Sequence, residues 1–226
     1  RRAHPTPQLM SRTHVLVDLD GTISNSLPGI ARSLQYAFAE CGYEPPTDDA
    51  VRSIIGPPFE VSFPILGVPV NEMAPVVAKY RERYNDIGLF ENAMYEGVPE
   101  MLEALLRDGL SLALATAKPE AVARRITAHF DVARHFVYEA GASPALNDNR
   151  RSKDQVITYC LAELGIAPGD HVVMLGDRDH DVEGALANGI DCVGVTWGFG
   201  SADELSGAGA HRIVDHPADV LAAVSA

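Results

Sequence analysis

His-Val-Leu-Val-Asp-Leu-Asp-Gly-Thr, residues 14–22, is a short apolar run that ends in two acids and a glycine. Residues 15–17 are too few for a helix and rich in β-branched side chains, which indicates a buried strand. In an open α/β sheet, ligands bind outside the carboxyl ends of the strands. We therefore expect Asp18 and Asp20 to lie at the mouth of a crevice.

The spacing of Asp18 and Asp20 suggests a shared task. Alternate strand residues share a face, so a chain that is leaving a strand can aim both carboxylates at one point. Two close carboxylates repel unless one holds a proton or a cation lies between them. Mg²⁺ takes oxygen ligands and often bridges to a phosphate oxygen, so Asp18 could attack phosphorus while Asp20 handles a proton. A bare Asp-x-Asp is also typical of a solvated turn or a cap, and the full string is the more specific signal.

Residues 15–22 resemble the first motif of the haloacid dehalogenase superfamily, most of whose members are magnesium-dependent phosphatases. The resemblance implies that Asp18 is the nucleophile and forms an aspartyl-phosphate. It implies that Asp20 is the general acid for the leaving group and then the base for the attacking water. It also argues against a true dehalogenase, because that branch lacks the second acid.

Thr116 and Lys153 resemble the second and third motifs of this superfamily. Thr116 follows a predicted strand over residues 110–115, where its hydroxyl and nearby backbone N–H groups could bind phosphate oxygens. A helix N-cap would use threonine as well. Lys153 opens a predicted helix, where a cation is unfavourable with the helix dipole. The resemblance implies that Lys153 neutralises Asp18 and the transferring phosphoryl group.

Residues 176–181, Gly-Asp-Arg-Asp-His-Asp, resemble the fourth motif. The resemblance implies that Asp177 binds Mg²⁺ through its side chain beside Asp18, and that the main-chain oxygen of Asp20 is a further ligand. Asp181 would orient a metal-bound water or the lysine of the third motif. The four motifs in order imply phosphoryl transfer assisted by a magnesium ion.

Several charged residues near these motifs are expected to have no part in the chemistry. Solvated surface positions are predicted for Lys118, Arg150, Arg151 and His180. Mg²⁺ prefers oxygen ligands, which argues against His180 as a ligand.

The pattern along the chain predicts an α/β fold with a doubly wound, mostly parallel, Rossmann-like sheet. Residues 14–23 and 98–226 would form this core, after a disordered lead-in over residues 1–13. Strands are expected at 15–17, 110–115, 136–139, 171–175 and 192–196, with a weak strand after them. Helices are expected at 98–108, 120–130, 152–165 and 179–189, and near the carboxyl terminus.

Residues 24–97 are predicted to be a small all-helical cap inserted after the first strand. Apolar residues recur at helical spacing over 30–38, Thr47 is a candidate N-cap, and 71–87 is periodic as well. Residues 55–58, Ile-Gly-Pro-Pro, should break the helix. The block contains no convincing strand.

Composition narrows the function further. The 226 residues carry a formal charge of −13, which argues against a nucleic-acid surface, and 46% are apolar, which is ample for a core. Three widely spaced cysteines favour neither a disulfide framework nor a zinc site, and are consistent with a reducing cytoplasm. No run is long enough to span a membrane. We expect a cytoplasmic protein that acts on a small phosphorylated substrate.

The insert, residues 55–58 and residues 196–200 resemble the phosphoglycolate phosphatase branch of the superfamily. That resemblance implies a cap that excludes water once substrate is bound. Specificity would rest on Arg52 and on residues near Pro57 and Phe59. The expected activity is hydrolysis of a small phosphomonoester, such as phosphoglycolate, a sugar phosphate or a nucleotide.

Two other functions stay open. A phosphotransferase or mutase would pass the phosphoryl group to an acceptor other than water. The chain is also similar to an actinobacterial member described as protein tyrosine kinase A, through its Arg/Pro-containing lead-in and residues 176–182, so the acceptor could be a protein. Nothing resembles the Gly-rich loop of eukaryotic-type kinases. A binding protein with a relic site is disfavoured by the complete set of acids.

Overall fold

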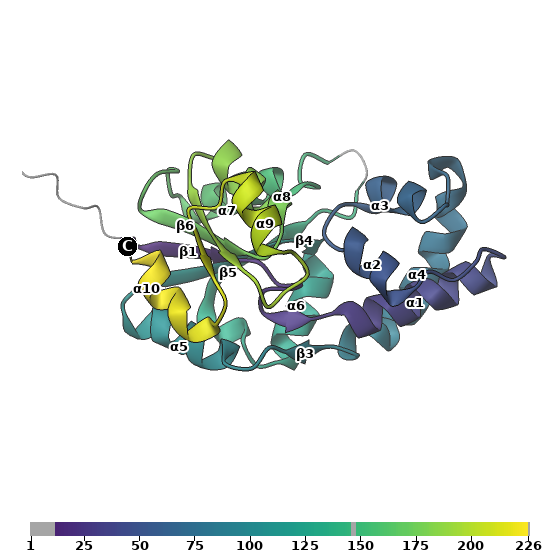
Figure 1. Ribbon diagram of the computed structural model, residues 1–226, viewed down its shortest axis with the longest axis horizontal. Helices are drawn as coiled ribbons and strands as arrows, with labels where there is room; N and C mark the ends of the chain where they lie inside the picture. The colour runs from purple at the N-terminus through teal and green to yellow at the C-terminus, as the bar shows by residue number, and fades with distance from the viewer. Residues whose placement is uncertain (1–11, 146–147, 226) are drawn as a thin grey trace, which may run out of the picture.

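The computed structural model describes residues 12–145 and 148–225. Its main sheet has six parallel strands in the order β5-β4-β1-β6-β7-β8 (Figure 1). The strands are β1 (His14–Val17), β4 (Ser111–Pro119), β5 (Phe136–Ala142), β6 (Val172–Gly176), β7 (Asp191–Val195) and β8 (Arg212–Val214). The predicted α/β class and the mostly parallel sheet are confirmed.

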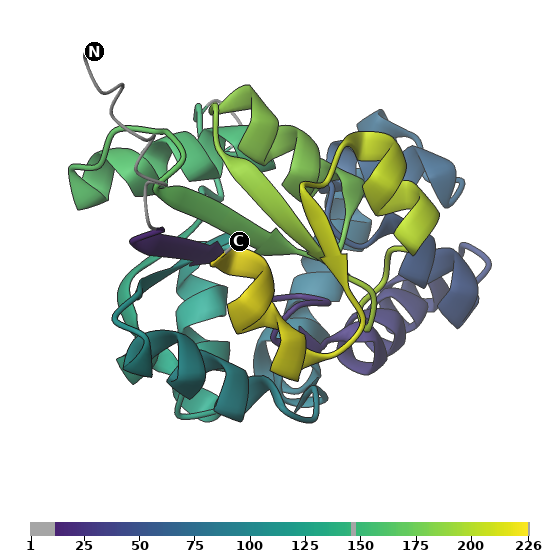
Figure 2. The same cartoon turned by 60° about the vertical axis from the view of Figure 1, so that its left-hand side comes forward.

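Strand β1 is central because both of its faces are buried. Val15 and Val17 pack into one apolar cluster and Leu16 packs into a second one on the opposite face. Such a strand lies between two helical layers, which is why its sequence is a continuous apolar run. Figure 2 shows the two layers, with teal helices on one side of the sheet and green helices on the other.

The helices of the two layers follow the strands in alternation. One layer contains α5 (Val98–Arg107), α6 (Glu120–His129) and α10 (Val220–Val224), and the other contains α7 (Lys153–Leu164), α8 (Asp179–Ala187) and α9 (Ala202–Ala208). The doubly wound, Rossmann-like arrangement expected from the sequence is therefore confirmed.

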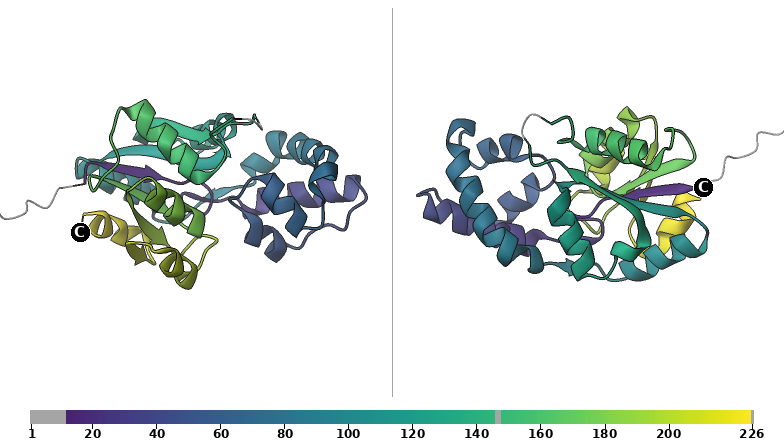
Figure 3. Two further views of the ribbon diagram at one scale, coloured as in Figure 1. Left: turned by 90° about the horizontal axis from the view of Figure 1, so that it is seen from above. Right: turned by 180° about the vertical axis from the view of Figure 1, so that it is seen from behind.

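A helical insert after β1 forms one end of the molecule (Figure 3). Its helices are α1 (Leu27–Glu40), α2 (Asp48–Ile54), α3 (Phe59–Ile65) and α4 (Met73–Asp86), with 3₁₀ turns η1 (Val70–Glu72) and η2 (Gly88–Phe90). Thr47 caps α2 as predicted, because its side chain accepts a hydrogen bond from the Ala50 N–H. We call this insert the cap.

The prediction of no strand within residues 24–97 is wrong at both ends of that block. β2 (Ser24–Asn25) and β3 (Ala93–Met94) form a two-stranded antiparallel sheet. Each strand has two residues, too few to show an alternating pattern, and their pairing joins positions far apart in the sequence. This small sheet lies where the chain leaves the core and returns to it (Figure 1).

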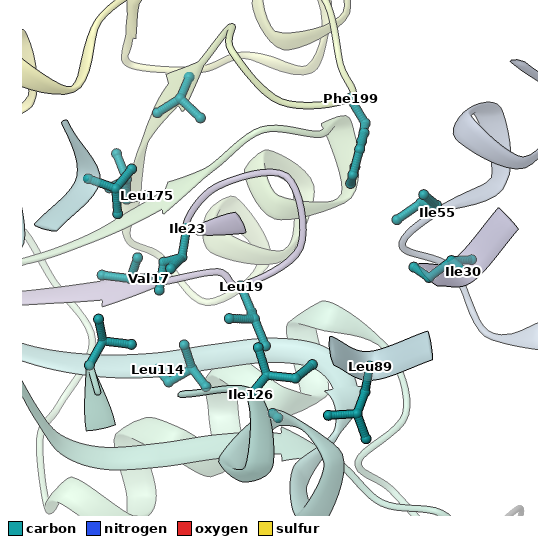
Figure 4. Packing of buried hydrophobic residues seen from close by; sticks show 14 of the residues in the cluster. Val17, Leu19, Ile23, Ile30, Ile55, Leu89, Leu114, Ile126, Leu175 and Phe199 are labelled. Atoms are coloured by element: carbon teal, nitrogen blue, oxygen red, sulfur yellow. The ribbon is translucent and has the colours of Figure 1, made fainter. Parts of the chain in front are cut away.

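The apolar interior continues from the core into the cap. Figure 4 shows Val17, Leu114 and Ile126 of the core in the same cluster as Ile30 and Leu89 of the cap. The cap is therefore packed against the core.

Residues 1–11 of the expected lead-in lie outside the described residues, whereas Arg12 and Thr13 contact the core. The Thr13 N–H donates to the His171 carbonyl, and Arg12 donates to the Asp170 carbonyl. Among the described helices, none alone has the length and apolar character needed to cross a membrane. Helices Phe59–Ile65 and Val70–Asp86 meet that test only as a pair, by length and composition, with a bend of 107° between them.

Candidate active site

The candidate site lies at the carboxyl ends of three neighbouring strands. Asp18 follows β1, Asp177 follows β6, and Thr116 lies in the last part of β4. Because β4, β1 and β6 are adjacent and parallel, their ends meet at one edge of the sheet. Asp18 is held there by its N–H, which donates to the Leu175 carbonyl of β6 at 3.0 Å.

Lys153 joins two acids of this edge. Its Nζ lies 2.7 Å from Asp18 Oδ1 and 2.8 Å from Asp181 Oδ1, and it donates to the Ala115 carbonyl. All three charged side chains are buried. Lys153 is the first residue of α7, where the helix dipole is unfavourable for a cation. Its ion pairs with the two carboxylates offset this cost.

Burial and mutual contact shift the pKa values of these groups. Burial raises the pKa of Asp18, although Lys153 opposes the shift. Burial would also raise the pKa of Asp181 and lower that of Lys153. The ion pairs prevail in both cases, so Asp18 and then Asp181 raise the pKa of Lys153, and Lys153 lowers the pKa of Asp181. Lys153 is therefore a permanent cation at neutral pH.

Asp177 is fully buried in a cradle of backbone. Its carboxylate accepts hydrogen bonds from the Phe199 N–H at 2.7 Å and from the Thr22 hydroxyl at 3.3 Å. A Cβ at Gly21 or Gly198 would lie 2.1 or 2.4 Å from Asp177 Oδ2, so only glycine fits at either position. Burial, and then the nearby acids Asp181 and Asp18, raise the pKa of Asp177 to about 8.

Lys118 is buried, and the prediction that it is solvated is wrong. Its Nζ lies 2.6 Å from Asp20 Oδ2 and 5.2 Å from the ring centre of Tyr84 in the cap. Its backbone N–H donates to the hydroxyl of Thr116, two residues earlier in β4. The two-residue spacing of Thr116 and Lys118 could have indicated from the sequence that both side chains point to the site, because alternate strand residues share a face.

His180 also lies in the site, whereas the sequence favoured a solvent-facing position. Its ring is covered by the cap, since a Cβ at Gly56 would lie 2.2 Å from His180 Cε1. Donor atoms of Asp18, His180 and Asp181 all lie within 4.8 Å of one another, so this group could hold a metal ion. The contact with Gly56 of the cap joins segments that are far apart in the sequence, so the local pattern did not reveal it.

The charge of the site suits a divalent cation. Three carboxylates, of Asp18, Asp177 and Asp181, are buried in the site, and one buried ammonium group, that of Lys153, pairs with two of them, Asp18 and Asp181. Two formal negative charges are thus in excess, which is costly at this depth without a cation or bound protons. Oxygen donors of this kind match the preference of Mg²⁺.

Arg150 and Arg151 are tied to neighbouring groups, so the prediction of solvated cations is wrong for both. Arg151 donates to both oxygens of Glu60 in the cap, at 2.7 and 2.8 Å. Arg150 donates to Glu120 and its guanidinium lies 4.0 Å from the ring centre of Tyr159. Their partners are distant in sequence, which is why the local pattern did not reveal them.

Two further arginines connect cap and core. Arg52, expected to act in specificity, donates to the Gly198 carbonyl and lies over the Phe199 ring. Arg178 donates to the Ile55 carbonyl at 3.0 Å. The cap is thus held over the carboxyl edge of the sheet.

Cap and core line a partly open cavity of about 570 Å³. Its core end includes Asp18, Asp20, Thr116 and Lys118. Its cap wall is mostly apolar and aromatic, and includes Ile30, Leu34, Ile54, Ile55, Phe59, Tyr80 and Tyr84. Three of these rings form a row of contacts. The ring centroids of Phe59 and Tyr80 are 5.2 Å apart, and those of Tyr80 and Tyr84 are 5.0 Å apart. An apolar pocket with a few convergent polar groups is typical of a small-molecule site.

Comparison with known proteins agrees with this arrangement. A family model described as haloacid dehalogenase-like hydrolase matches residues 15–195. The chain belongs to this family. The resemblance of its four motifs to the haloacid dehalogenase superfamily is thereby confirmed, and the chain is a hydrolase with a Rossmann-like core.

Members of the haloacid dehalogenase-like family with a similar sequence have different names. A 5'-nucleotidase of Pseudomonas aeruginosa is 40% identical over 210 residues, which are 92% of each chain. The tyrosine-protein kinase PtkA of Mycobacterium tuberculosis is 40% identical over 198 residues, which are 88% of this chain and 65% of that protein. Phosphoglycolate phosphatase 1 of P. aeruginosa is 26% identical over 92% of this chain and 78% of that one.

Solved structures of the family have the same fold. A "predicted phosphatase" from Clostridium acetobutylicum superposes with a TM-score of 0.88 and 33% identity, over 95% of this chain and 98% of that one. The structure of M. tuberculosis PtkA superposes with a TM-score of 0.81 and 34% identity, over 96% and 99%. The helical insert after β1 is thus part of a known architecture.

Proposed function

We propose that this chain is a Mg²⁺-dependent phosphomonoesterase whose preferred substrates are nucleoside 5'-monophosphates. The observation that carries the proposal is the cavity, which has Asp18 and Asp20 at its core end and an apolar, aromatic wall at its cap end. The first feature suits a phosphoryl group and the second suits a nucleobase.

In the proposed reaction, Asp18 attacks phosphorus and forms an aspartyl-phosphate while the ester bond to the leaving oxygen breaks. Asp20 gives its proton to that oxygen. Its Oδ2 is paired with Lys118, and its Oδ1 has no hydrogen-bond partner among the described residues, which leaves Oδ1 free to exchange the proton. Asp20 then takes a proton from water, which attacks the aspartyl-phosphate and releases inorganic phosphate and free Asp18.

The remaining residues would neutralise and orient the phosphoryl group. Lys153 compensates the charge of Asp18, and the hydroxyl of Thr116 would bind a phosphoryl oxygen. Mg²⁺ would be held by the carboxylates of Asp18 and Asp177 and by the main-chain oxygen of Asp20, with Asp181 orienting its water or Lys153. When bound, the ion would offset the charge of the phosphoryl oxygens. Residues 24–97 would act as a cap that excludes water.

The shape of the cavity favours a nucleotide over phosphoglycolate. A two-carbon phosphate ester would fill little of about 570 Å³ and would leave the aromatic wall without contacts. Burial of a flat apolar group against Phe59 and Tyr80 would add favourable contacts at the cap end. The 40% identical P. aeruginosa relative named 5'-nucleotidase supports the same class, whereas the relative named phosphoglycolate phosphatase 1 is 26% identical.

Transfer to a protein acceptor is the second candidate, because the match to PtkA is also 40% identical. This chain spans 65% of that protein's length, so its whole activity does not carry over by similarity. In that reaction, the aspartyl-phosphate on Asp18 would be attacked by a tyrosine hydroxyl in place of water.

A substrate panel tests the proposal. The measurement is steady-state kcat/KM for 5'-nucleotides, phosphoglycolate, glucose 6-phosphate and phosphotyrosine, with Mg²⁺ and with excess chelator. We expect a nucleotide to exceed the other classes at least about tenfold, and chelator to abolish turnover because the acids lose their shared cation. Preference for phosphoglycolate would overturn the nucleotide assignment. Full activity in chelator would overturn the role of the metal. Transfer of a labelled phosphoryl group from the substrate to a tyrosine peptide, instead of its release as inorganic phosphate, would favour the second candidate.

A further inference from the structure

Lys118 is a buried cation at the core end of the cavity, and the proposed reaction assigns it no role. Its side chain is only 6% exposed, and its Nζ lies 2.6 Å from Asp20 Oδ2. Removing an ammonium group from water is costly unless an anion compensates it, so lysines are seldom this deeply buried. The anion that compensates Lys118 is the proposed general acid.

The carboxylate of Asp20 depends on Lys118 for a partner. The Asp20 side chain lines the cavity, its Oδ2 is paired with Lys118, and its Oδ1 has no hydrogen-bond partner among the described residues. Asp18 and Asp181, by contrast, share Lys153. Two different lysines therefore hold the nucleophile and the general acid. Without Lys118, no ionic or hydrogen-bonding partner among the described residues would keep the Asp20 carboxylate in one orientation.

Lys118 is itself held in place at its backbone and at its ammonium group. Its N–H donates to the Thr116 hydroxyl oxygen at 3.3 Å. Its carbonyl oxygen packs on Gly141 of β5, where an added Cβ would lie 2.7 Å from that oxygen. Its Nζ lies 5.2 Å from the ring centre of Tyr84 in the cap, a contact that favours a cation. The ammonium group is thus preorganised beside Asp20.

We propose that Lys118 is a positioning residue that orients the carboxyl group of Asp20 for proton transfer to the leaving oxygen. This inference rests on the proposed phosphomonoesterase function. In that reaction, the proton of Asp20 passes to the ester oxygen while the bond between this oxygen and phosphorus breaks and Asp18 bonds to phosphorus. An alkyl oxygen needs that proton, whereas 4-nitrophenolate is stable as an anion and leaves without it. Lys118 should therefore matter most for alkyl esters.

The test compares Lys118→Met with wild type on 5'-AMP, an alkyl ester, and on 4-nitrophenyl phosphate, in the full chain with Mg²⁺. Methionine keeps an unbranched apolar side chain but removes the ammonium group. We expect the ratio of kcat/KM for 5'-AMP over 4-nitrophenyl phosphate to fall at least about tenfold, because only the alkyl ester needs the proton. The matched control is Lys79→Met, whose ammonium group pairs with Glu82 within the cap, and it should keep the wild-type ratio.

A double variant shows whether Lys118 acts through Asp20. If it does, adding Lys118→Met to Asp20→Asn should change kcat/KM for 5'-AMP less than about twofold, because the group that Lys118 orients is already absent. A full further loss in the double variant would overturn the positioning role.

The ratio also separates positioning from a structural role. Partial unfolding lowers both rates equally and leaves the ratio unchanged. An unchanged ratio in Lys118→Met, with or without an equal loss on both esters, would therefore overturn the proposal. Should wild type fail to hydrolyse nucleotides, the nucleotide assignment fails by itself, and the best alkyl ester of the panel replaces 5'-AMP. Failure of wild type on every ester would instead overturn the phosphomonoesterase function.

Discussion

Asp18 combines three properties that a nucleophilic carboxylate needs. It is buried at a strand end, it contacts a cation in Lys153, and it faces a cavity large enough for a substrate. Asp181 contacts the same lysine, so the ammonium group stays paired whichever acid is engaged.

Asp18→Asn should lower kcat at least about 10⁴-fold while the protein stays folded, because the amide keeps the shape but not the nucleophile. Lys153 keeps Asp181 as a partner, so no buried cation is left unpaired. Steady-state rates on the best substrate, with circular dichroism as the measure of folding, check this prediction. Asp203→Asn, which alters an exposed acid of α9, is the control. A wild-type rate in Asp18→Asn would remove Asp18 from the mechanism.

At the scale of the elements, helix α1 of the cap lies in direct backbone contact with the 3₁₀ turn η2. Gly29 in α1 packs directly on the backbone of η2, and an added Cβ would lie 1.9 Å from the Gly88 carbonyl oxygen. The same η2 turn limits the space beside Tyr84. Two glycines thus fix how the cap's first helix and its last turn approach each other.

Gly29→Ala should lower the free energy of unfolding by about 3 kcal/mol or more, because the backbone contact cannot give way. Gly207→Ala in α9 is the matched opposite case, since an added Cβ there meets nothing within 4 Å. It should raise stability by about 0.5–1 kcal/mol by reducing the freedom of the unfolded chain. Urea denaturation of both variants checks the pair. Equal changes in the free energy of unfolding for Gly29→Ala and Gly207→Ala would show that the close approach of α1 to η2 does not exclude a side chain at residue 29.

Over the molecule as a whole, cap and core are joined by charged contacts around a cavity that is partly open to solvent. Arg151 with Glu60, Arg178 with the Ile55 carbonyl and Arg52 with the Gly198 carbonyl all cross this boundary. In the proposed function the cap admits substrate and then excludes water, so these contacts would open and close during turnover. Their strength should therefore set how often the cap is closed.

Glu60→Gln should weaken cap closure by about 1 kcal/mol and raise KM about fivefold, because the amide loses the ion pair in which one Arg151 nitrogen donates to both Glu60 oxygens. Amide hydrogen exchange in α3 should become faster as well. Glu82→Gln serves as control, since the partners of Glu82 among the described residues, Tyr36 and Lys79, both belong to the cap. Identical exchange and KM in the two variants would contradict a role for the Glu60 contact in closure.

The local sequence was enough to predict the layered α/β core, and this has a physical reason. Burial on both faces makes β1 continuously apolar, while helices show their own period, so each element is visible within a short window. The ends of β1 and β6 are visible too, which is why Asp18 and Asp177 stand out, whereas Thr116, Lys153 and Asp181 were named through the resemblance to the superfamily's motifs.

Contacts between distant segments were decided only by the tertiary structure. Lys118 looked like a surface lysine because Asp20 is 98 positions away and Tyr84 belongs to another part of the fold. Likewise, the cap encloses His180 through Gly56. Burial and ion pairing depend on which segments meet in space, and composition or periodicity along one segment carries no information about that. The sequence alone therefore determined the elements and the acids at their ends, and the packing of cap on core determined which other side chains join them.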